Sequence, residues 1–269
     1  MRRASAQTRV DALLVVERSC AEDVGLEEGP RPALGLAPSA TRHYGTSMYS
    51  GITRGTRPVV DTLELEGRTD LVVDLGPDLS RDLDLGASVA LDGVCLTVAA
   101  LDGTRAMFQV IAETLEKTTL SGLSVGGRVN VERSLRIGDE LGGHEVSGHV
   151  TGTGRITAVT RAGGRHDLRV SVPKEWMKYI FRKGFIAVDG SSLTVGETHP
   201  EGELELHLIP ETLRLTKLGE QRVGDRVNIE LDWRTVAIVD SVERVLAARL
   251  AEPPSGMGGG DGTEIGLPR

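Results

Sequence analysis

The sequence predicts an all-β protein made of two homologous domains in tandem, each a small barrel, followed by one amphipathic helix. The first observation is that the phrase VALDGVCLTV at 89–98 returns as IAVDGSSLTV at 186–195. The second is that short segments rich in Val, Ile, Leu and Thr recur about every ten residues between Gly or Asp-Gly turns, as β-strands do. The third is a single stretch with helical spacing of apolar residues near the C-terminus.

The repeat defines the two domains. Gly93 and Gly190 are 97 residues apart, and VGGRVNVE at 125–132 returns as VGDRVNIE at 223–230 after 98 residues. A period of this length is too long for a solenoid unit and suits a whole small domain. We therefore expect one domain at 48–144 and a second at 145–234.

The strands follow from the β-type segments of the first half, which lie at 70–75, 88–91, 95–100, 106–111 and 128–132. Regular short strands indicate either a sandwich or a closed barrel. The barrel is favoured, because about 95 residues supply roughly six strands and closure removes exposed strand edges.

The helix is expected at 235–251. Its apolar residues fall close to i, i+3, i+4 spacing, at Val236, Val239, Val242, Val245, Leu246 and Leu250. This stripe needs a partner, either a barrel wall or other copies of the helix. The ends of the chain have no counterpart in the repeat, so we expect an irregular extension at 1–47 and a flexible tail at 252–269, neither of which carries the function.

Composition excludes several classes of partner. A net charge of −8 argues against nucleic acid and anionic membranes, which both favour a basic face. No apolar run approaches the ~20 residues of a membrane span, and Ala12–Val16 is too short for the core of a signal peptide. The two cysteines, Cys20 and Cys95, could form one disulfide, but so few are typical of a reduced compartment. We expect a cytoplasmic protein.

Several motifs resemble the α-chain type of riboflavin synthase, in the lumazine-binding domain family, from about Met48 to Arg249. They are MYSGI at 48–52, DGVCLTV at 92–98, GGHEVSGH at 142–149, KGFIAVDG at 183–190, SLT at 192–194 and IPETL at 209–213. The resemblance implies six-stranded antiparallel Greek-key barrels and a homotrimer joined through the C-terminal helix. It also raises association with lumazine synthase as an expectation. Chains of this family begin with a motif like MYSGI, so we expect residues 1–47 to be dispensable.

The implied reaction is the dismutation of two 6,7-dimethyl-8-ribityllumazine molecules, without metal or cofactor. One molecule gives a four-carbon unit to the other, yielding riboflavin and 5-amino-6-(D-ribitylamino)uracil. Two copies of one pocket suit two copies of one reactant, and orienting both can supply roughly 7–11 kcal/mol of the barrier. In the family, the facing pockets come from the N-terminal barrel of one subunit and the C-terminal barrel of a neighbour.

The two pockets differ at a few aligned positions. Cys95 aligns with Ser192, and His149 aligns with Ile52. A lone cysteine is usually a small buried hydrophobe, but the resemblance implies a nucleophile or proton carrier here. An imidazole present in only one copy favours acid–base work over packing. The catalytic residues implied by the resemblance are Ser88, Cys95, His149 and Asp232.

The resemblance also implies a set of lumazine-binding residues. In the first half they are Tyr49, Gly51, Ile52, Thr53, Cys95, Leu96, Thr97, Gln109, Val110, Ile111, Ala112, Glu113 and Thr114. In the second half they are Gly148, His149, Val150, Lys183, Ser192, Leu193, Thr194, Ile209, Pro210, Glu211, Thr212, Leu213 and Arg214. Tyr49 replaces the usual phenylalanine and Gln109 an often acidic residue, and we expect activity to survive the first change.

Two other functions compete with this one. A binding-only lumazine protein would share both barrels, but here the second pocket keeps Lys183, Ser192, Thr194, Glu211 and Asp232. A flavin reductase is a weaker alternative, because no G-x-G-x-x-G fingerprint follows. The sequence leaves open which pocket holds the four-carbon donor and which group removes the proton from the C7 methyl.

Overall fold

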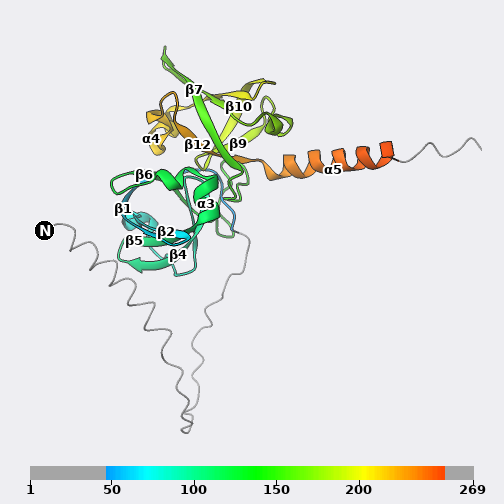
Figure 1. Cartoon of the computed structure of the whole chain (residues 1–269). Helices are drawn as coiled ribbons and strands as arrows, with labels where there is room; N and C mark the ends of the chain where they lie inside the picture. The colour runs from blue at the N-terminus through cyan, green and yellow to red at the C-terminus, as the bar shows by residue number, and fades with distance from the viewer. Residues whose placement is uncertain (1–46, 252–269) are drawn as a thin grey trace, which may run out of the picture. The chain divides into compact units, whose positions relative to one another are not determined.

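A computed structural model describes residues 47–251 of the chain (Figure 1). The expectations for the extension, apart from Ser47, and for the tail lie outside the described residues. The described chain contains two closed six-stranded antiparallel barrels, which confirms the predicted fold class. Both barrels belong to one compact unit that ends at Asp232.

The first barrel has the strand order β1-β2-β5-β4-β3-β6 around its wall. Its strands are β1 Thr56–Leu65, β2 Arg68–Asp74, β3 Ser88–Leu91, β4 Val94–Asp102, β5 Arg105–Ile111 and β6 Arg128–Arg133. Short helical segments connect them: α2 Gly76–Leu79, α3 Ala112–Lys117 and η1 Thr119–Gly122. All of these strands except β1 were predicted from the sequence.

The second barrel repeats this order as β7-β8-β11-β10-β9-β12. Its strands are β7 Gly152–Ala162, β8 Arg165–Ser171, β9 Phe185–Val188, β10 Ser191–His199, β11 Glu203–His207 and β12 Arg226–Leu231. The connecting segments are η2 Lys174–Tyr179, α4 Pro210–Leu215 and η3 Lys217–Glu220. The identical order confirms that the sequence repeat is a repeat of structure.

Alternation along the strands decides which side chains can reach a ligand. In β4, Leu96 and Val98 are buried in the barrel interior. On the opposite face of the strand, Cys95 is half-buried and Thr97 is exposed. The interior packs around large side chains such as Phe108, which is completely buried. The outer face of this strand is therefore available for chemistry.

The two copies of the repeated phrase meet at their hairpin turns. Asp92 and Gly93 have φ of +47° and +81°, and Asp189 and Gly190 have +44° and +79°, as tight two-residue hairpins require. A Cβ on Gly93 would lie 2.6 Å from the backbone nitrogen of Gly190. Only glycine allows the two turns to approach this closely.

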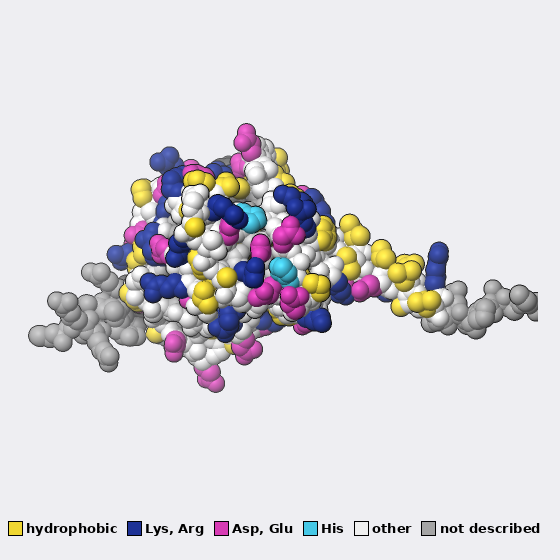
Figure 2. Space-filling model, turned by 90° about the horizontal axis from the view of Figure 1, so that it is seen from above, with side chains coloured by type: hydrophobic (Ala, Val, Ile, Leu, Met, Phe, Trp, Pro, Cys, Tyr) yellow, Lys and Arg dark blue, Asp and Glu magenta, His cyan; other side chains and the backbone are white. Residues whose placement is uncertain are grey.

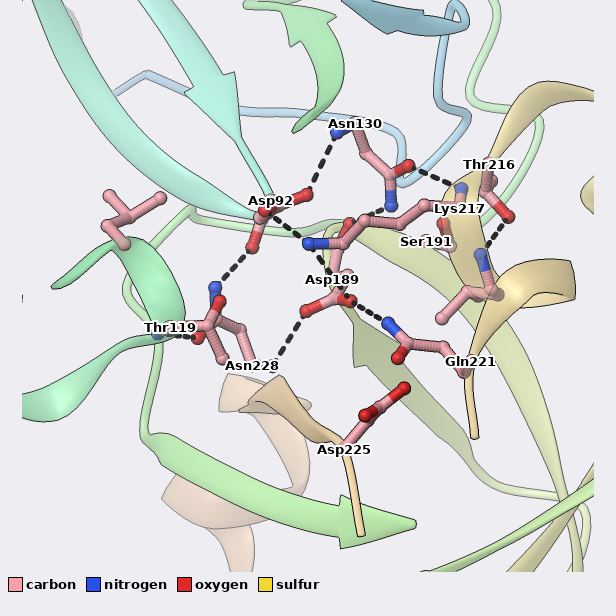
Figure 3. Close-up of polar contacts among 12 residues, drawn as sticks. Asp92, Thr119, Asn130, Asp189, Ser191, Thr216, Lys217, Gln221, Asp225 and Asn228 are labelled. Atoms are coloured by element: carbon pink, nitrogen blue, oxygen red, sulfur yellow. Dashed lines mark hydrogen bonds and ion pairs between the residues drawn. The ribbon is translucent and has the colours of Figure 1, made fainter. Parts of the chain in front are cut away.

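Two asparagines tie the turns together across the barrel interface (Figure 3). Asn130 donates from its side chain to the Asp189 carbonyl at 2.9 Å, and Asn228 donates to the Asp92 carbonyl at 2.8 Å. Each asparagine also donates its backbone N–H to the carboxylate of its own barrel, to Asp92 at 2.8 Å and to Asp189 at 2.7 Å. The interface thus has an approximate twofold arrangement.

Lys217 breaks that symmetry. Its Nζ lies 2.6 Å from Asp92 and 3.7 Å from Asp189, two carboxylates with no solvent exposure. The position 98 residues earlier holds Thr119, so only one lysine neutralises the pair. Burial opposes the charge of Lys217, but Asp189 and Asp92 together raise its pKa above the ordinary value. The lysine is therefore an inter-barrel charge clamp.

Helix α5, Trp233–Ala251, begins two residues before the expected start. Hydrophobic side chains run along it in Figure 2, and Val242, Val245 and Leu246 are 52%, 56% and 54% exposed. None of the helices within residues 47–251 has the length and apolar character of a membrane span. The stripe predicted from the sequence is thus present as an apolar surface.

Candidate active site

The segment that precedes each barrel is fixed by a buried glutamate. Ser50 donates from its N–H and its hydroxyl to Glu132 Oε1, both at 2.7 Å, and Ser147 donates in the same way to Glu230 Oε1, at 2.6 and 2.8 Å. Burial raises the pKa of both glutamates. Neither glutamate is among the site residues predicted from the sequence, although each is the last residue of the repeated VNVE/VNIE motif.

Each of these segments also crosses to the hairpin of the other barrel. The Cys95 N–H donates to the Gly148 carbonyl at 2.9 Å, and the Ser192 N–H donates to the Gly51 carbonyl at 2.8 Å. A Cβ on Gly148 would lie 2.5 Å from the Cβ of Cys95, so the close approach that this glycine permits is to the cysteine. The crossing brings residues of both halves of the sequence into each candidate site.

The first site surrounds Cys95. The Tyr49 hydroxyl donates to its Sγ at 3.1 Å, and burial raises the pKa of Tyr49, so that the hydroxyl keeps its proton. His149, which is exposed, follows Gly148 directly. Ser88 lies on the neighbouring strand β3, opposite Thr97, and its hydroxyl accepts a 2.5 Å hydrogen bond from Ser47. Thiol, imidazole and hydroxyl side chains therefore occupy one region.

The second site surrounds Ser192. Its hydroxyl lies 2.6 Å from Nδ1 of His144, whose ring stacks on Phe185 with centroids 5.2 Å apart. His144 is buried, so this hydrogen bond holds the Ser192 hydroxyl in one orientation. Thr194, two residues further along β10, is exposed. This site offers hydroxyl groups where the first site offers a thiol.

Lys183 has an unusual backbone conformation at the edge of the second site. Its φ is +69°, and the matching position of the first barrel is Gly86, with φ +81°. Its N–H donates to the Val195 carbonyl on β10 at 2.9 Å, and its side chain is exposed. A lysine in the left-handed region is strained where glycine is not, and such outliers favour a functional explanation.

The predicted loop residues begin the two short helices. Glu113 forms an ion pair with Lys117 at 2.5 Å, and Glu211 with Arg214 at 2.5 Å. Both pairs are on the surface, so they leave the carboxylates accessible to a ligand. The residues Ile111, Ala112, Ile209 and Pro210 beside them are also exposed.

Some predicted binding residues have inward-facing side chains. Leu96, Val110 and Leu193 are buried in the barrels, so only their backbone can reach a ligand. Thr53 is buried as well, 3.1 Å from the hydroxyl of Ser191 in the other barrel. Tyr49, Gly51 and Gly148 are buried too. The remaining predicted residues are at least partly accessible: Ile52, Gln109, Thr114, Val150, Thr212, Leu213, Arg214 and Asp232. Asp232 directly follows β12.

One accessible polar residue was not found from the sequence. His207 is the counterpart of Gln109 at a spacing of 98 residues and lies at the end of β11. The repeat spacing that aligned the other pairs would have identified it. Within residues 47–251, no group of three or more His, Cys, Asp or Glu side chains is arranged to hold a metal ion.

Comparisons with known proteins agree with this arrangement. The lumazine binding domain model matches twice, at residues 50–134 and 147–232. The riboflavin synthase of Escherichia coli K12 is 45% identical over 203 residues, which cover 75% of this chain and 95% of that protein. The riboflavin synthase of Chlamydia pneumoniae is 43% identical over 202 residues, covering 75% and 98%.

Solved structures show the same fold. LumP complexed with riboflavin superposes with a TM-score of 0.64 at 22% identity, covering 68% of this chain and 99% of that chain. LumP complexed with 6,7-dimethyl-8-(1'-D-ribityl) lumazine gives a TM-score of 0.62 at 21% identity, with the same coverage. At this identity the likeness concerns the fold alone.

Proposed function

The chain belongs to the riboflavin synthases of the lumazine-binding domain family, and we propose that each of its barrels binds one lumazine molecule. Its activity is the dismutation of two 6,7-dimethyl-8-ribityllumazine molecules to riboflavin and 5-amino-6-(D-ribitylamino)uracil. The observation that carries the two-site proposal is the crossed pairing of Cys95 with Gly148 and of Ser192 with Gly51. Because the same backbone pairing occurs in both barrels, the duplicated domain provides two corresponding sites.

The first-barrel site supplies the reactive groups. Cys95 carries a free thiol, Ser88 lies on the neighbouring strand β3, and His149 follows Gly148, whose carbonyl accepts from the Cys95 N–H. The thiol acts as a nucleophile or proton carrier, and the exposed imidazole acts as a general acid or base. Cys95 and Thr97 face outward from β4, as a flat ligand laid against the barrel would require. Gln109, Glu113 and Thr114 contact the polar edge of this lumazine.

The second-barrel site supplies binding and orientation. Ser192 and Thr194 offer hydroxyls, Lys183 offers a positive charge, and Glu211 and Thr212 contact the polar edge of the second lumazine. The strained backbone of Lys183 supports a role at the ligand. Asp232 provides a carboxylate near this site. Holding both molecules face to face reduces the entropy lost in the transition state.

A turnover assay tests the proposal. Purified protein is incubated with 6,7-dimethyl-8-ribityllumazine and no reductant, and riboflavin is followed by its absorbance and fluorescence. We expect one riboflavin for every two lumazines consumed, because one lumazine gives its four-carbon unit to the other and leaves as the uracil product. Stoichiometric lumazine binding without riboflavin would instead identify a binding-only lumazine protein.

The assembly that completes the site is a homotrimer. The apolar surface of α5, with Val242, Val245 and Leu246 more than half exposed, supports this proposal, because such a stripe requires a partner. Light scattering should give a molecular mass three times that of the chain. Leu246→Glu should lower the measured mass to that of a single chain. The family resemblance also supports a cytoplasmic location and an association with lumazine synthase, which co-sedimentation would test.

A further inference from the structure

Three neighbouring strands of the second barrel carry a row of polar side chains on one face. Arg226 on β12 lies opposite Arg155 on β7, and Arg155 lies opposite Ser171 on β8. Residues directly opposite each other on antiparallel strands share a face, with Cβ atoms about 5 Å apart. The strand neighbours Ile156 and Val170 are buried in the barrel, so the row faces outward.

The two arginines of this row repel each other, because like charges directly opposite on neighbouring strands destabilise a sheet. Arg155 donates to the Gly224 carbonyl at 2.7 Å. Arg226 donates to the Thr153 hydroxyl at 3.0 Å. Between residues 47 and 251 neither arginine forms an ion pair with a carboxylate, although the chain as a whole has a net charge of −8. The row is therefore a positively charged surface that lacks an anion.

The first barrel carries the corresponding row with its charges balanced. The matching residues, 97 or 98 positions earlier in the chain, are Arg128, Pro58 and Asp74. Proline thus replaces one of the two arginines, and aspartate replaces Ser171. The Asp74 carboxylate is readily ionised, because a hydrogen bond from the Thr104 side chain lowers its pKa. The second barrel has therefore gained a cation in this row and lost the carboxylate that would neutralise it.

A cavity of about 330 Å³ opens beside the row, and Arg155, Ser171 and Arg226 all line it. This volume is at the small end of the range for small-molecule sites. Within the described part of the chain the Ser171 hydroxyl makes no hydrogen bond, so it is available to a ligand. No lining residue belongs to the two candidate sites around Cys95 and Ser192. The cavity is thus separate from the proposed reaction.

The first barrel fills the corresponding space with a side chain of its own. Arg57, which matches Gly154, donates to the Leu75 carbonyl at 2.7 Å and to the Asp78 carboxylate at 2.6 Å. Leu75 in turn matches Val172, which lines the cavity. Because Gly154 has no side chain, the second barrel leaves this space open beside its two arginines.

We propose that this cavity binds a phosphate group, with Arg155 and Arg226 supplying the positive charge and Ser171 a hydroxyl donor. A phosphate monoester carries a charge of roughly −1.5 to −2 at pH 7, which two guanidinium groups neutralise. The fork of N–H groups on arginine matches the spacing of phosphate oxygens. The next residue of the row, Glu203 on β11, does not line the cavity and is paired with Arg169 at 4.0 Å.

Isothermal titration of the full chain with inorganic phosphate at pH 7.5 tests the site, with sodium chloride holding the ionic strength constant. We expect one saturable site per chain. Arg155→Gln should weaken binding at least tenfold, because hydrogen bonds between charged groups are among the strongest. Glycerol phosphate is titrated in parallel to identify the source of the phosphate group. Tighter binding than that of inorganic phosphate indicates a phosphorylated small molecule, and equal or weaker binding indicates the free ion.

Arg128→Gln is the matched control. Arg128 donates to the Thr56 hydroxyl in the first barrel, as Arg226 does to the Thr153 hydroxyl in the second. The substitution therefore removes the same contact and the same charge from a row that has its own carboxylate. It should leave the affinity for phosphate unchanged.

Ser171→Asp gives a result that damage to the barrel cannot imitate. It installs the carboxylate of the first barrel, so phosphate binding should fall at least tenfold while the thermal midpoint rises, because the arginines gain an anion. Ser171→Asn has a similar size without the charge and should retain most of the affinity. If the protein has no saturable phosphate site, if Arg128→Gln weakens binding as much as Arg155→Gln, or if Ser171→Asp binds phosphate unchanged, the inference is wrong.

Discussion

The hydroxyl of Tyr49 donates a hydrogen bond to Sγ of Cys95 across 3.1 Å. The tyrosine ring is completely buried, packed with Ala90, Val146 and Ala187, so it is a fixed part of the protein interior. Its hydroxyl therefore holds the thiol in one orientation. Tyr49 is among the lumazine-binding residues that the family resemblance implies, but a ring with no solvent exposure has no free face for a ligand.

Tyr49→Phe tests this relationship, since it removes only the hydroxyl. We expect the free energy of unfolding to fall by about 1 kcal/mol, the usual worth of one hydrogen bond. The thiol should become more mobile and react several-fold faster with iodoacetamide, while kcat falls by less than about fivefold. Mass-spectrometric alkylation of Cys95 measures the reactivity. An unchanged alkylation rate would show that the hydroxyl does not restrain the sulfur.

Cys95→Ser and His149→Gln should affect rate more than folding. The aligned residues Ser192 and Ile52 show that the barrel accepts other side chains at both positions. We expect turnover to fall at least tenfold, with a thermal midpoint within a few degrees of the original, or roughly 1 kcal/mol. Steady-state kinetics and calorimetry measure the two effects. A variant that unfolds early yet keeps its activity per folded molecule would make that residue structural.

The strands of the first barrel could be predicted where the repeat and the alternation of apolar residues agreed. Strand β1 was missed because its apolar pattern is weak. Only Val59 of β1 is buried, so the strand has little of the hydrophobic contrast that identifies the others. The repeat also identified the equivalence of Cys95 with Ser192 and of Gly51 with Gly148. It could not show that each glycine pairs with the hairpin of the other barrel. The repeat spacing shows which positions correspond to each other, but it does not show which residues are in contact.

The inter-barrel charge clamp could not be predicted from the sequence, for a related reason. Lys217 is 125 residues from Asp92, and nothing local in either segment links them. The pairing depends on the closeness of two hairpin turns, which only the assembled barrels produce. His207 is a different case, because the spacing of 98 residues from Gln109 was already known and would have located it.

Lys183→Gly should separate stability from function. The substitution installs the residue of the first barrel, where glycine adopts the same left-handed conformation without strain. We expect the free energy of unfolding to rise by roughly 0.5–1 kcal/mol while turnover falls at least tenfold. Asp82→Gly is the control, because Asp82 also has a positive φ, +52°, and is outside the proposed site. It should change stability in the same direction and leave turnover intact; equal activity of both variants would remove Lys183 from the site.

Lys217→Thr should make stability strongly dependent on pH. The sign follows from Asp189, whose pKa burial raises from 3.8 to about 7. A group with a raised pKa in the folded state stabilises the fold at low pH, and that contribution is lost as the pH rises through about 7. Without the lysine, Asp92 and Asp189 would face each other unneutralised, so their pKa values should rise further.

We therefore expect Lys217→Thr to lower the free energy of unfolding by about 3–5 kcal/mol at pH 8, where an unpaired buried charge must be accommodated. At pH 5 the carboxyls can take up protons, and the loss should be much smaller. Urea unfolding at the two pH values measures this difference. Adding Asp92→Asn to Lys217→Thr removes one carboxylate together with its partner and should restore much of the stability at pH 8. A loss that is equal at both pH values would mean that Lys217 acts by packing its aliphatic stem, and the charge clamp would have to be abandoned.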